Sequence, residues 1–243
     1  NPDRITAAFP YQDLYNTIFY TNVIINEAGL KVPASDEKNQ LIGEAYALRA
    51  MAYFDLINLF AKPYNATTAS TDKGVPLALK IDLEQAYVPE SVAVIYNQIL
   101  LDSKEAENLL NKDTQATGMN YRFSKAALYA LESRIYLYQK EWQKALAATE
   151  KALTYNSNLV NLNTTPLLVN KYDSAESILA LESVFLIRLK NYTFPSPELI
   201  ANYNKLTDLR FGLYFQANGS SYKFKSEIKE YANQKCSFRT SEL

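Results

Sequence analysis

The sequence predicts a mainly α-helical protein whose second half is irregular and rich in loops. One helical motif occurs twice in the first half of the chain, and the helical spacing of apolar residues is lost after residue 156. Hydrophobic residues make up 48% of the chain and charged residues 21%, a balance typical of folded globular proteins. The 243 residues therefore suffice for one large core or two small ones.

The repeated motif runs from Ala47 to Tyr53 and again from Ala130 to Tyr136, with Ala, Leu, a small residue and Tyr at the same spacing. Small residues let two helices approach closely, and the tyrosine ring fills the gap between them. This arrangement resembles a tetratricopeptide (TPR) unit, a helix–turn–helix repeat. Such repeats build curved binding surfaces rather than catalytic sites.

Helices are expected where apolar residues recur at three- and four-residue spacing. The expected ranges are 11–28, 36–60, 91–110, 124–139 and 142–153. Gly29 is expected to end the first helix, and serines at positions 35, 91 and 124 are expected to cap the later ones. Trp142 and Ala145 are expected to pack on the helix that contains Tyr136. Residues 61–90 form a long loop punctuated by proline, and loops of this length are often functional.

The second half contains shorter elements. Strands are expected over 177–182 and 184–189, a short helix over 197–206, and a hairpin with strands 211–216 and 221–225 around the turn Asn218-Gly219. The chain is thus predicted to have a TPR-like helical region at 1–156 and an irregular ligand-binding half at 157–243, incomplete at its C-terminal end.

Composition excludes several classes of function. The chain has no histidine and one cysteine, Cys236, which rules out His-dependent triads, His-containing zinc sites and an internal disulfide. Six glycines form neither a dinucleotide-binding nor a P-loop motif, and a net charge of −1 argues against a nucleic-acid partner. We expect a protein without cofactor, metal or catalytic residues, although paired carboxylates stay open as a catalytic alternative.

Charged residues within the expected helices are interpreted as structural. Glu44 and Arg49 in one helix, and Glu132 and Arg134 in another, are expected to be buried or half-buried charges satisfied by neighbouring repeats. Asp208 and Arg210 are similarly expected to tie a loop to the scaffold.

An ordered set of motifs resembles the SusD/RagB family. The motifs cover nearly the whole chain and are residues 43–54, 74–77, 95–102, 122–127, 134–138, 176–178, 208–210 and the terminal Phe-Arg-Thr-Ser-Glu-Leu at 238–243. The resemblance implies a TPR-like helical scaffold that carries an irregular ligand-binding half. It also implies a surface-exposed lipoprotein of the outer membrane of Bacteroidetes-type bacteria, which captures glycans or other nutrients for a TonB-dependent, SusC-like transporter.

The sequence departs from the family at both ends. The export signal, the lipid-bearing cysteine and the first segment are absent, and the chain stops where the family continues into a further helical region. We therefore expect a chain that is itself soluble, whose only link to the membrane would be an anchor outside this sequence. No apolar span of about 20 residues is present.

Sugar binding without catalysis requires aromatic faces for pyranose rings and polar side chains for hydroxyls. Two places in the second half combine them, and the predicted ligand-binding residues are Asn191, Tyr192, Phe194, Tyr214, Asn218 and Tyr222. A third set, Lys62, Tyr64 and Asn65, lies in the long loop. Packing or bare surface is the alternative for each set. For the protein as a whole, the alternative is a TPR-like adaptor that binds a protein or peptide.

Overall fold

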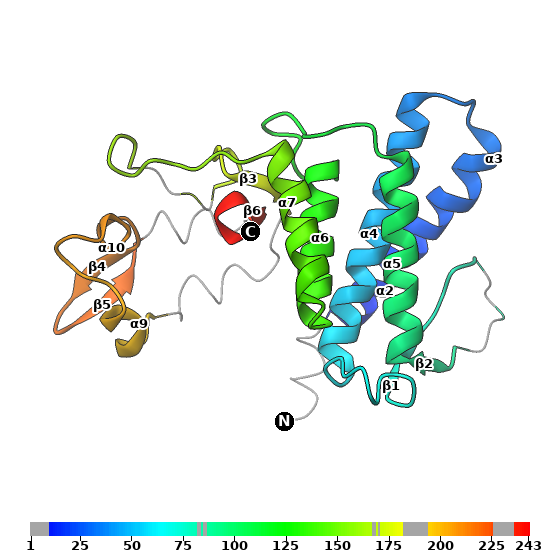
Figure 1. Ribbon diagram of the computed structural model, residues 1–243, viewed down its shortest axis with the longest axis horizontal. Helices are drawn as coiled ribbons and strands as arrows, with labels where there is room; N and C mark the ends of the chain where they lie inside the picture. Colours follow the sequence, from blue (N-terminus) through cyan, green and yellow to red (C-terminus); the bar gives the residue numbers. More distant parts are fainter. Residues whose placement is uncertain are drawn as a thin grey trace. The chain divides into compact units, whose positions relative to one another are not determined.

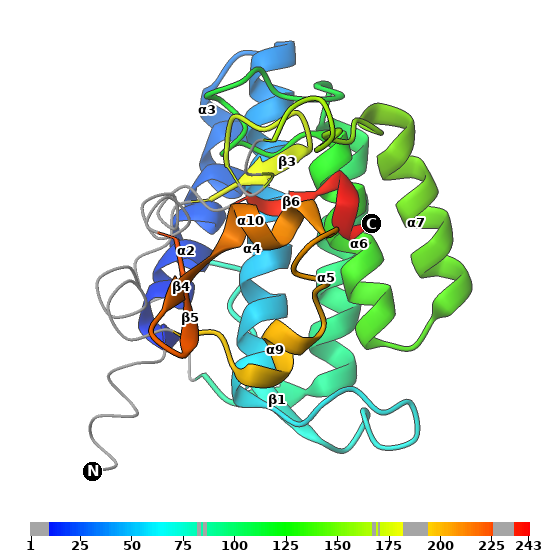
Figure 2. The same ribbon diagram turned by 90° about the vertical axis from the view of Figure 1, so that its left-hand side faces the viewer.

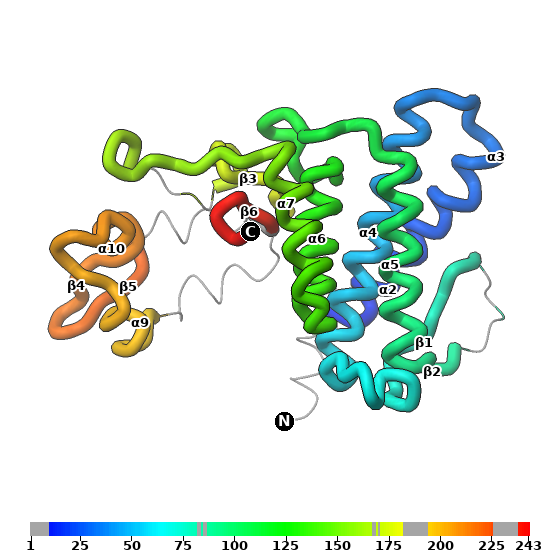
Figure 3. The backbone as a smooth tube through the Cα atoms, in the orientation of Figure 1, coloured from blue at the N-terminus to red at the C-terminus, as the bar shows by residue number. Residues whose placement is uncertain are grey.

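The computed structural model describes residues 10–81, 84, 87–166, 169, 171–181, 194–225 and 236–243. The chain divides into two compact units (Figures 1 and 3). The first unit comprises Asn1–Asp113 and Phe123–Tyr155, and the second comprises Thr114–Arg122 and Asn156–Leu243. Segment 114–122 groups with the second unit, which the sequence did not predict. Within the described residues, no helix combines the length and apolar character needed to cross a membrane.

The first helix is longer than the sequence predicted. α2 (Tyr11–Val23) continues through a π-helical turn, η1 (Ile24–Ala28), into α3 (Gly29–Lys31). The prediction that Gly29 ends the helix is wrong, because its φ of −55° is helical rather than left-handed. The helix ends instead at Val32, which is extended at φ −102° and ψ 132°. Val32 precedes Pro33, and proline disfavours a helical conformation in the residue before it.

The other helices of the first unit begin where capping serines predict. They are α4 (Asp36–Phe60), α5 (Val92–Leu109), α6 (Lys125–Tyr138) and α7 (Trp142–Tyr155). Ser35 Oγ accepts a hydrogen bond from the backbone N–H of Lys38 at 3.1 Å. Ser91 Oγ and Ser124 Oγ likewise each accept one, at 3.3 Å, from the N–H of the residue three positions later in the chain. Each cap satisfies a backbone donor that has no partner within its helix. The three predicted caps are confirmed.

α4 is the central helix of this unit. It packs against α2 on one side and α5 on the other, while α6 packs against α7 (Figure 2). Ala47, Ala50 and Tyr53 of α4 are completely buried, as the small-residue motif predicts. The helices thus pack in two pairs that follow the order of the chain, α4 with α5 and α6 with α7.

The second copy of the motif is less enclosed than the first. Tyr136 is half-buried, whereas Tyr53 has no exposed surface. Ala145 is buried, as expected, but Trp142 is 61% exposed. Trp142 is the first residue of α7, and only from Ala145 onward does that helix bury side chains.

The long loop is closed by a small ribbon that the sequence did not predict. β1 (Lys73–Pro76) pairs antiparallel with β2 (Pro89–Ser91), with Lys73 opposite Ser91 and Pro76 opposite Pro89. The register shifts between these two pairs, so the ribbon contains a bulge. The ribbon brings residues 76–80 of the loop back against the helices.

The second unit contains short elements. β3 (Ser177–Ala180) pairs antiparallel with β6 (Cys236–Arg239), which leads into the 3₁₀ turn η3 (Thr240–Glu242). β4 (Phe215–Asn218) and β5 (Ser221–Phe224) form the predicted hairpin, with Gly219 at a φ of +62° in its turn. The strand expected over 177–182 is confirmed for 177–180, and the strand expected over 184–189 lies outside the described residues.

Two predicted boundaries in this unit are wrong. The helix expected over 197–206 is shorter than predicted and comprises only α9 (Pro197–Ala201). Beyond it the chain turns, because the side chain of Asn204 accepts hydrogen bonds from the N–H groups of Leu206 and Thr207. Residues 211–214, expected as strand, belong to α10 (Leu209–Tyr214), which the Asp208 side chain caps at the N–H of Arg210.

Candidate functional site

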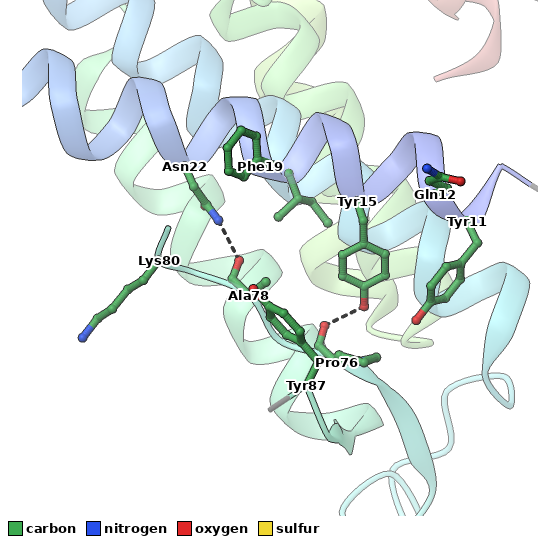
Figure 4. Close-up of a pocket in the computed structure, with 10 residues that line it drawn as sticks. Tyr11, Gln12, Tyr15, Phe19, Asn22, Pro76, Ala78, Lys80 and Tyr87 are labelled. Atoms are coloured by element: carbon green, nitrogen blue, oxygen red, sulfur yellow. Dashed lines mark hydrogen bonds between the residues drawn. The ribbon is translucent and has the colours of Figure 1, made fainter. Parts of the chain in front are cut away.

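A hollow in the first unit is lined by one face of α2. Tyr11, Tyr15, Phe19 and Asn22 follow each other at spacings of four, four and three, which places their side chains on the same face of the helix. The opposite wall is formed by Pro76, the last residue of β1, and by the loop between β1 and β2. The pocket has a volume of about 360 Å³ (Figure 4). Its lining residues are Tyr11, Gln12, Tyr15, Ile18, Phe19, Asn22, Pro76, Ala78, Lys80 and Tyr87.

Helix side chains hold the loop wall by its main chain. The Tyr15 hydroxyl donates to the carbonyl of Pro76 at 2.7 Å, and Asn22 Nδ2 donates to the carbonyl of Ala78 at 2.9 Å (Figure 4). The Tyr53 hydroxyl also donates to that carbonyl at 2.9 Å and accepts from the Ala78 N–H at 2.7 Å. Three side chains therefore fix two residues of the wall.

A buried ion pair orients one of these anchors. Arg49 donates from Nε and Nη2 to the two carboxylate oxygens of Asp102, at 2.8 and 2.6 Å. Its Nη1 donates to Asn22 Oδ1 at 2.7 Å, which turns the amide nitrogen of Asn22 toward Ala78. Arg49 and Asp102 are 4% and 1% exposed. The prediction that Arg49 is a buried charge satisfied by a neighbouring helix is confirmed.

The pocket presents aromatic rings at its surface. Tyr11, Phe19 and Tyr87 are 39%, 43% and 50% exposed. The Tyr11 ring is held edge-on against Phe60, with centroids 4.8 Å apart. Burial raises the pKa of the Tyr15 phenol far above its usual range, so this hydroxyl stays neutral and keeps donating to Pro76. Ring faces beside a side-chain amide, Gln12, and an ammonium group, Lys80, are the combination that sugar recognition uses.

The ligand-binding residues predicted from the sequence are not among the residues that line this pocket. Asn191 and Tyr192 lie outside the described residues. Phe194 is 59% exposed, and Asn218 is exposed beside the hairpin turn, where its carbonyl accepts from Ser221 Oγ at 3.0 Å. The structure brings Tyr214 and Tyr222 to one place, because both pack against the buried cluster of Ile200, Phe211 and Phe215.

The two tyrosines of this cluster are half-buried rather than freely exposed. The Tyr222 ring lies edge-on to Phe211 with centroids 5.1 Å apart, and Lys205 Nζ lies 4.7 Å from the centre of the same ring. Burial raises the pKa of Tyr214. Both rings thus contribute to the packing of the second unit, and their role in binding stays a prediction.

The third set of sequence candidates has intramolecular partners. Lys62 Nζ pairs with Asp72 Oδ1 at 2.8 Å, and Asn65 Oδ1 accepts from the N–H of Thr67 at 3.0 Å. The Tyr64 ring packs edge-on against Tyr96, with centroids 4.8 Å apart. These contacts organise the loop.

The sequence did contain one signal for the pocket. Three aromatic residues recur every four positions at Tyr11, Tyr15 and Phe19, which predicts an aromatic stripe along one helix face. The opposite wall gives no such signal, because its contacts with α2 join residues 56 and 61 positions apart. Among the described residues, no group of three or more His, Cys, Asp or Glu side chains is arranged to hold a metal ion.

Comparison with known proteins identifies the family. Residues 1–137 match a family model described as SusD-like, starch-binding and associating with the outer membrane. The chain belongs to the SusD-like family. A SusD-like protein of Formosa agariphila is 30% identical over 166 residues, which cover 67% of this chain and 29% of that protein.

Solved structures show the same fold for this SusD-like chain. A SusD superfamily protein from Bacteroides thetaiotaomicron has a TM-score of 0.79 at 20% identity, over 96% of this chain and 59% of that one. A protein from Bacteroides vulgatus titled as a putative sugar-binding protein has a TM-score of 0.79 at 22% identity, over 94% of this chain and 57% of that one. A laminarin-binding SusD-like protein has a TM-score of 0.59 at 26% identity, over 71% and 37%.

These matches confirm the mainly helical, TPR-like fold that the sequence predicts. The SusD-like chain spans 29% of the Formosa protein and less than two thirds of each of these solved chains.

Proposed function

We propose that this SusD-like chain belongs to a non-catalytic glycan-binding protein and that the pocket beside α2 takes part in binding. The observation that carries the proposal is an aromatic-lined hollow with a fixed wall, in a chain whose family is described as starch-binding. A pocket with a rigid wall loses little conformational entropy when a ligand enters, which favours affinity. The solved relatives titled as sugar-binding and laminarin-binding support the same class of ligand.

The proposed protein is a surface-exposed lipoprotein of the cell outer membrane that delivers its ligand to a SusC-like, TonB-dependent transporter. Family membership supports this setting, because the family model describes association with the outer membrane. Co-purification of the complete protein with a SusC-like transporter, from membranes that contain both, would test the partnership. Recovery of the complete protein without any transporter would contradict it.

The ligand is tested with two neutral probes, a starch-derived malto-oligosaccharide and a laminarin oligosaccharide. We expect at least one to bind the complete protein in calorimetric titration. Phe19→Ala should weaken that binding about tenfold, because one stacked ring contributes about 1–1.5 kcal/mol. Phe19 is suited to this test because it is not one of the side chains that hold the wall by hydrogen bonds, whereas Tyr15 is.

Tyr121→Ala is the matched control, since Tyr121 is 54% exposed and does not line the pocket. The residues predicted from the sequence form the competing site. Variants Tyr192→Ala, Phe194→Ala, Tyr214→Ala and Tyr222→Ala should leave affinity unchanged if the α2 pocket is the main site. If these variants lose binding while Phe19→Ala binds with normal affinity, the binding site would be in the second unit.

Two other outcomes would contradict the proposal itself. Binding of peptides but of neither glycan would favour the TPR-like adaptor. Release of reducing sugar by the pure, complete protein, abolished by changing one carboxylate, would show catalysis. The absence of histidine from the 243 residues argues against the commonest general bases and nucleophile partners.

A further inference from the structure

A second hollow lies in the first unit, away from the α2 pocket. It has a volume of about 700 Å³, within the range of small-molecule sites. Three helices contribute to it, and Figure 2 shows α5, α6 and α7 side by side. Its lining residues are Asn97, Leu100, Leu101, Lys104 and Glu107 of α5, Glu132 and Tyr136 of α6, and Lys151 of α7.

The spacing of these residues explains why they face one space. On α5 they recur at three- or four-residue steps from position 97 to 107, and on α6 Glu132 and Tyr136 are four apart. Leu101 is 58% exposed, and Leu100 and Tyr136 are half-buried. The hollow therefore offers apolar surface beside charged groups.

One of its two carboxylates, that of Glu107, accepts two hydrogen bonds from within the protein. Glu107 Oε1 accepts a hydrogen bond from the Tyr129 hydroxyl at 2.7 Å and from Lys151 Nζ at 3.3 Å. These donors hold the pKa of Glu107 below its usual value. Lys151 Nζ also lies 4.8 Å from the centre of the Tyr129 ring, so its charge has two partners already.

The other carboxylate is not engaged. Glu132 is half-buried and makes no hydrogen bond or ion pair with any residue in the described ranges. Burial, with Glu107 nearby, raises the pKa of Glu132 to about 7. The prediction that Glu132 is satisfied by a neighbouring repeat is therefore wrong. Lys151, whose charge opposes the rise in this pKa, makes its hydrogen bond with Glu107 and its ring contact with Tyr129 instead.

We propose that this hollow is a second ligand site, which takes a group bearing a protonated primary amine, with Glu132 as its counter-ion. An ammonium group placed against Glu132 supplies the charge-assisted hydrogen bonds that the carboxylate lacks. Leu100, Leu101 and the Tyr136 ring cover the carbon atoms next to the amine, and Asn97 faces the remainder of the ligand. The proposal does not depend on the α2 pocket.

Two sources of such an amine are distinguished by the probes. One probe is a glucosamine oligosaccharide, the other is spermidine, and the N-acetylated oligosaccharide of the same length is the uncharged match for the first. We expect one amine probe to bind the complete protein and the N-acetylated probe to bind at least tenfold more weakly. Preference for the oligosaccharide assigns an amino sugar, and preference for spermidine assigns a polyamine.

Glu132→Gln should weaken the amine probe about tenfold, because it removes the charge and keeps the shape. Glu105→Gln is the matched control on α5, since residue 105 is exposed and does not line the hollow. Melting temperature and circular dichroism would verify that both variants are folded.

Binding should also weaken as the pH falls from about 8 to about 5.5, because Glu132 then gains a proton. The other titratable groups that line the hollow are Glu107 and Lys104 on α5, Lys151 on α7, and Tyr136 on the same helix as Glu132. Tyr129, also on that helix, interacts electrostatically with Glu132. Of the two glutamates, Glu132 has a pKa raised to about 7, whereas the pKa of Glu107 is lowered. Equal binding of the acetylated probe, no binding of either amine, or an unchanged affinity in Glu132→Gln would each overturn the proposal.

Discussion

At the scale of single residues, Arg49 places a full positive charge inside the helical unit, where 4% of the residue is exposed. The charge is tolerated because Asp102 takes two of its donors and Asn22 a third. Gln98 adds a hydrogen bond to Asp102 Oδ1 at 2.8 Å. The same set of bonds connects α5 and α4 with α2, and through Asn22 it reaches the pocket wall.

Arg49→Met should destabilise the protein by about 3–5 kcal/mol, because Asp102 is left buried without its counter-charge. Urea unfolding followed by circular dichroism would measure the change in free energy. The double variant Arg49→Met/Asp102→Leu removes both charges and should recover much of the loss. A single variant as stable as the natural protein would show that the pair contributes little.

Glu132 makes stability depend on pH. Its pKa in the folded protein is about 7, against 4.5 for an ordinary glutamate, so the folded state holds the proton more tightly than the unfolded state. The contribution of Glu132 is therefore most favourable at low pH and is lost as the pH rises through this interval. The melting temperature of Glu132→Gln minus that of the natural protein should therefore increase as the pH rises from about 4.5 to about 7.5. A constant difference across that range, like that expected for Glu105→Gln, would contradict the shift.

At the scale of elements, α4 and the end of α5 approach each other closely at Gly43. A Cβ on Gly43 would lie 3.0 Å from the backbone nitrogen of Leu110 and 3.1 Å from Leu109 Cβ. Gly43 thus lets α4 and α5 approach each other closely. The small residues of the repeated motif have the same role further along α4, where Ala47 and Ala50 are fully buried.

Gly43→Ala should destabilise the protein by about 1–3 kcal/mol, because the backbone at the end of α5 would have to move. The direction is informative, since alanine in an unobstructed helix is favoured over glycine by about 1 kcal/mol. Gly212→Ala in α10 is the control, because no atom lies within 4 Å of its added Cβ. Thermal unfolding of the two variants should show opposite shifts. A stabilised Gly43→Ala would mean that the two helices separate at little cost.

The elements that the sequence predicted well carry local signals. The serine caps fixed the starts of α4, α5 and α6, and Asn218-Gly219 fixed the hairpin turn. Predictions failed where contacts with residues distant in the sequence determine the structure of a segment. Examples are the ribbon of β1 with β2 and the loop wall held by α2. One wall of the pocket has a signal in the sequence, the aromatic stripe on α2, which was not among the predicted sites. The other wall has no such signal, because it depends on bonds between residues more than 50 positions apart.

At the scale of the whole molecule, each described unit has its own buried core, and the two hollows both lie in the helical unit. The α2 pocket carries one cationic side chain, Lys80, among neutral lining residues, whereas the hollow between α5, α6 and α7 carries four charged ones. The two hollows should therefore respond differently to salt.

Affinity for a neutral oligosaccharide at the α2 pocket should change less than about twofold between about 0.05 M and about 0.5 M salt, because binding forms no ion pair. Calorimetric titration at several salt concentrations would measure this. The amine probe at Glu132 serves as the internal comparison and should weaken over the same range. A steep salt dependence at the α2 pocket would indicate a charged glycan.

The wall of the α2 pocket is held at carbonyl oxygens and one N–H, and none of the bonds from Tyr15, Asn22 and Tyr53 involves a side chain of the wall. The backbone conformation of the wall therefore does not depend on these bonds reaching particular side chains of the wall. Substitutions at Leu77, Leu79 or Lys80 leave these attachments in place. Relatives that keep the three anchors are free to diversify this stretch and to acquire new ligand preferences with little loss of stability, which makes it a natural starting point for redesigning specificity.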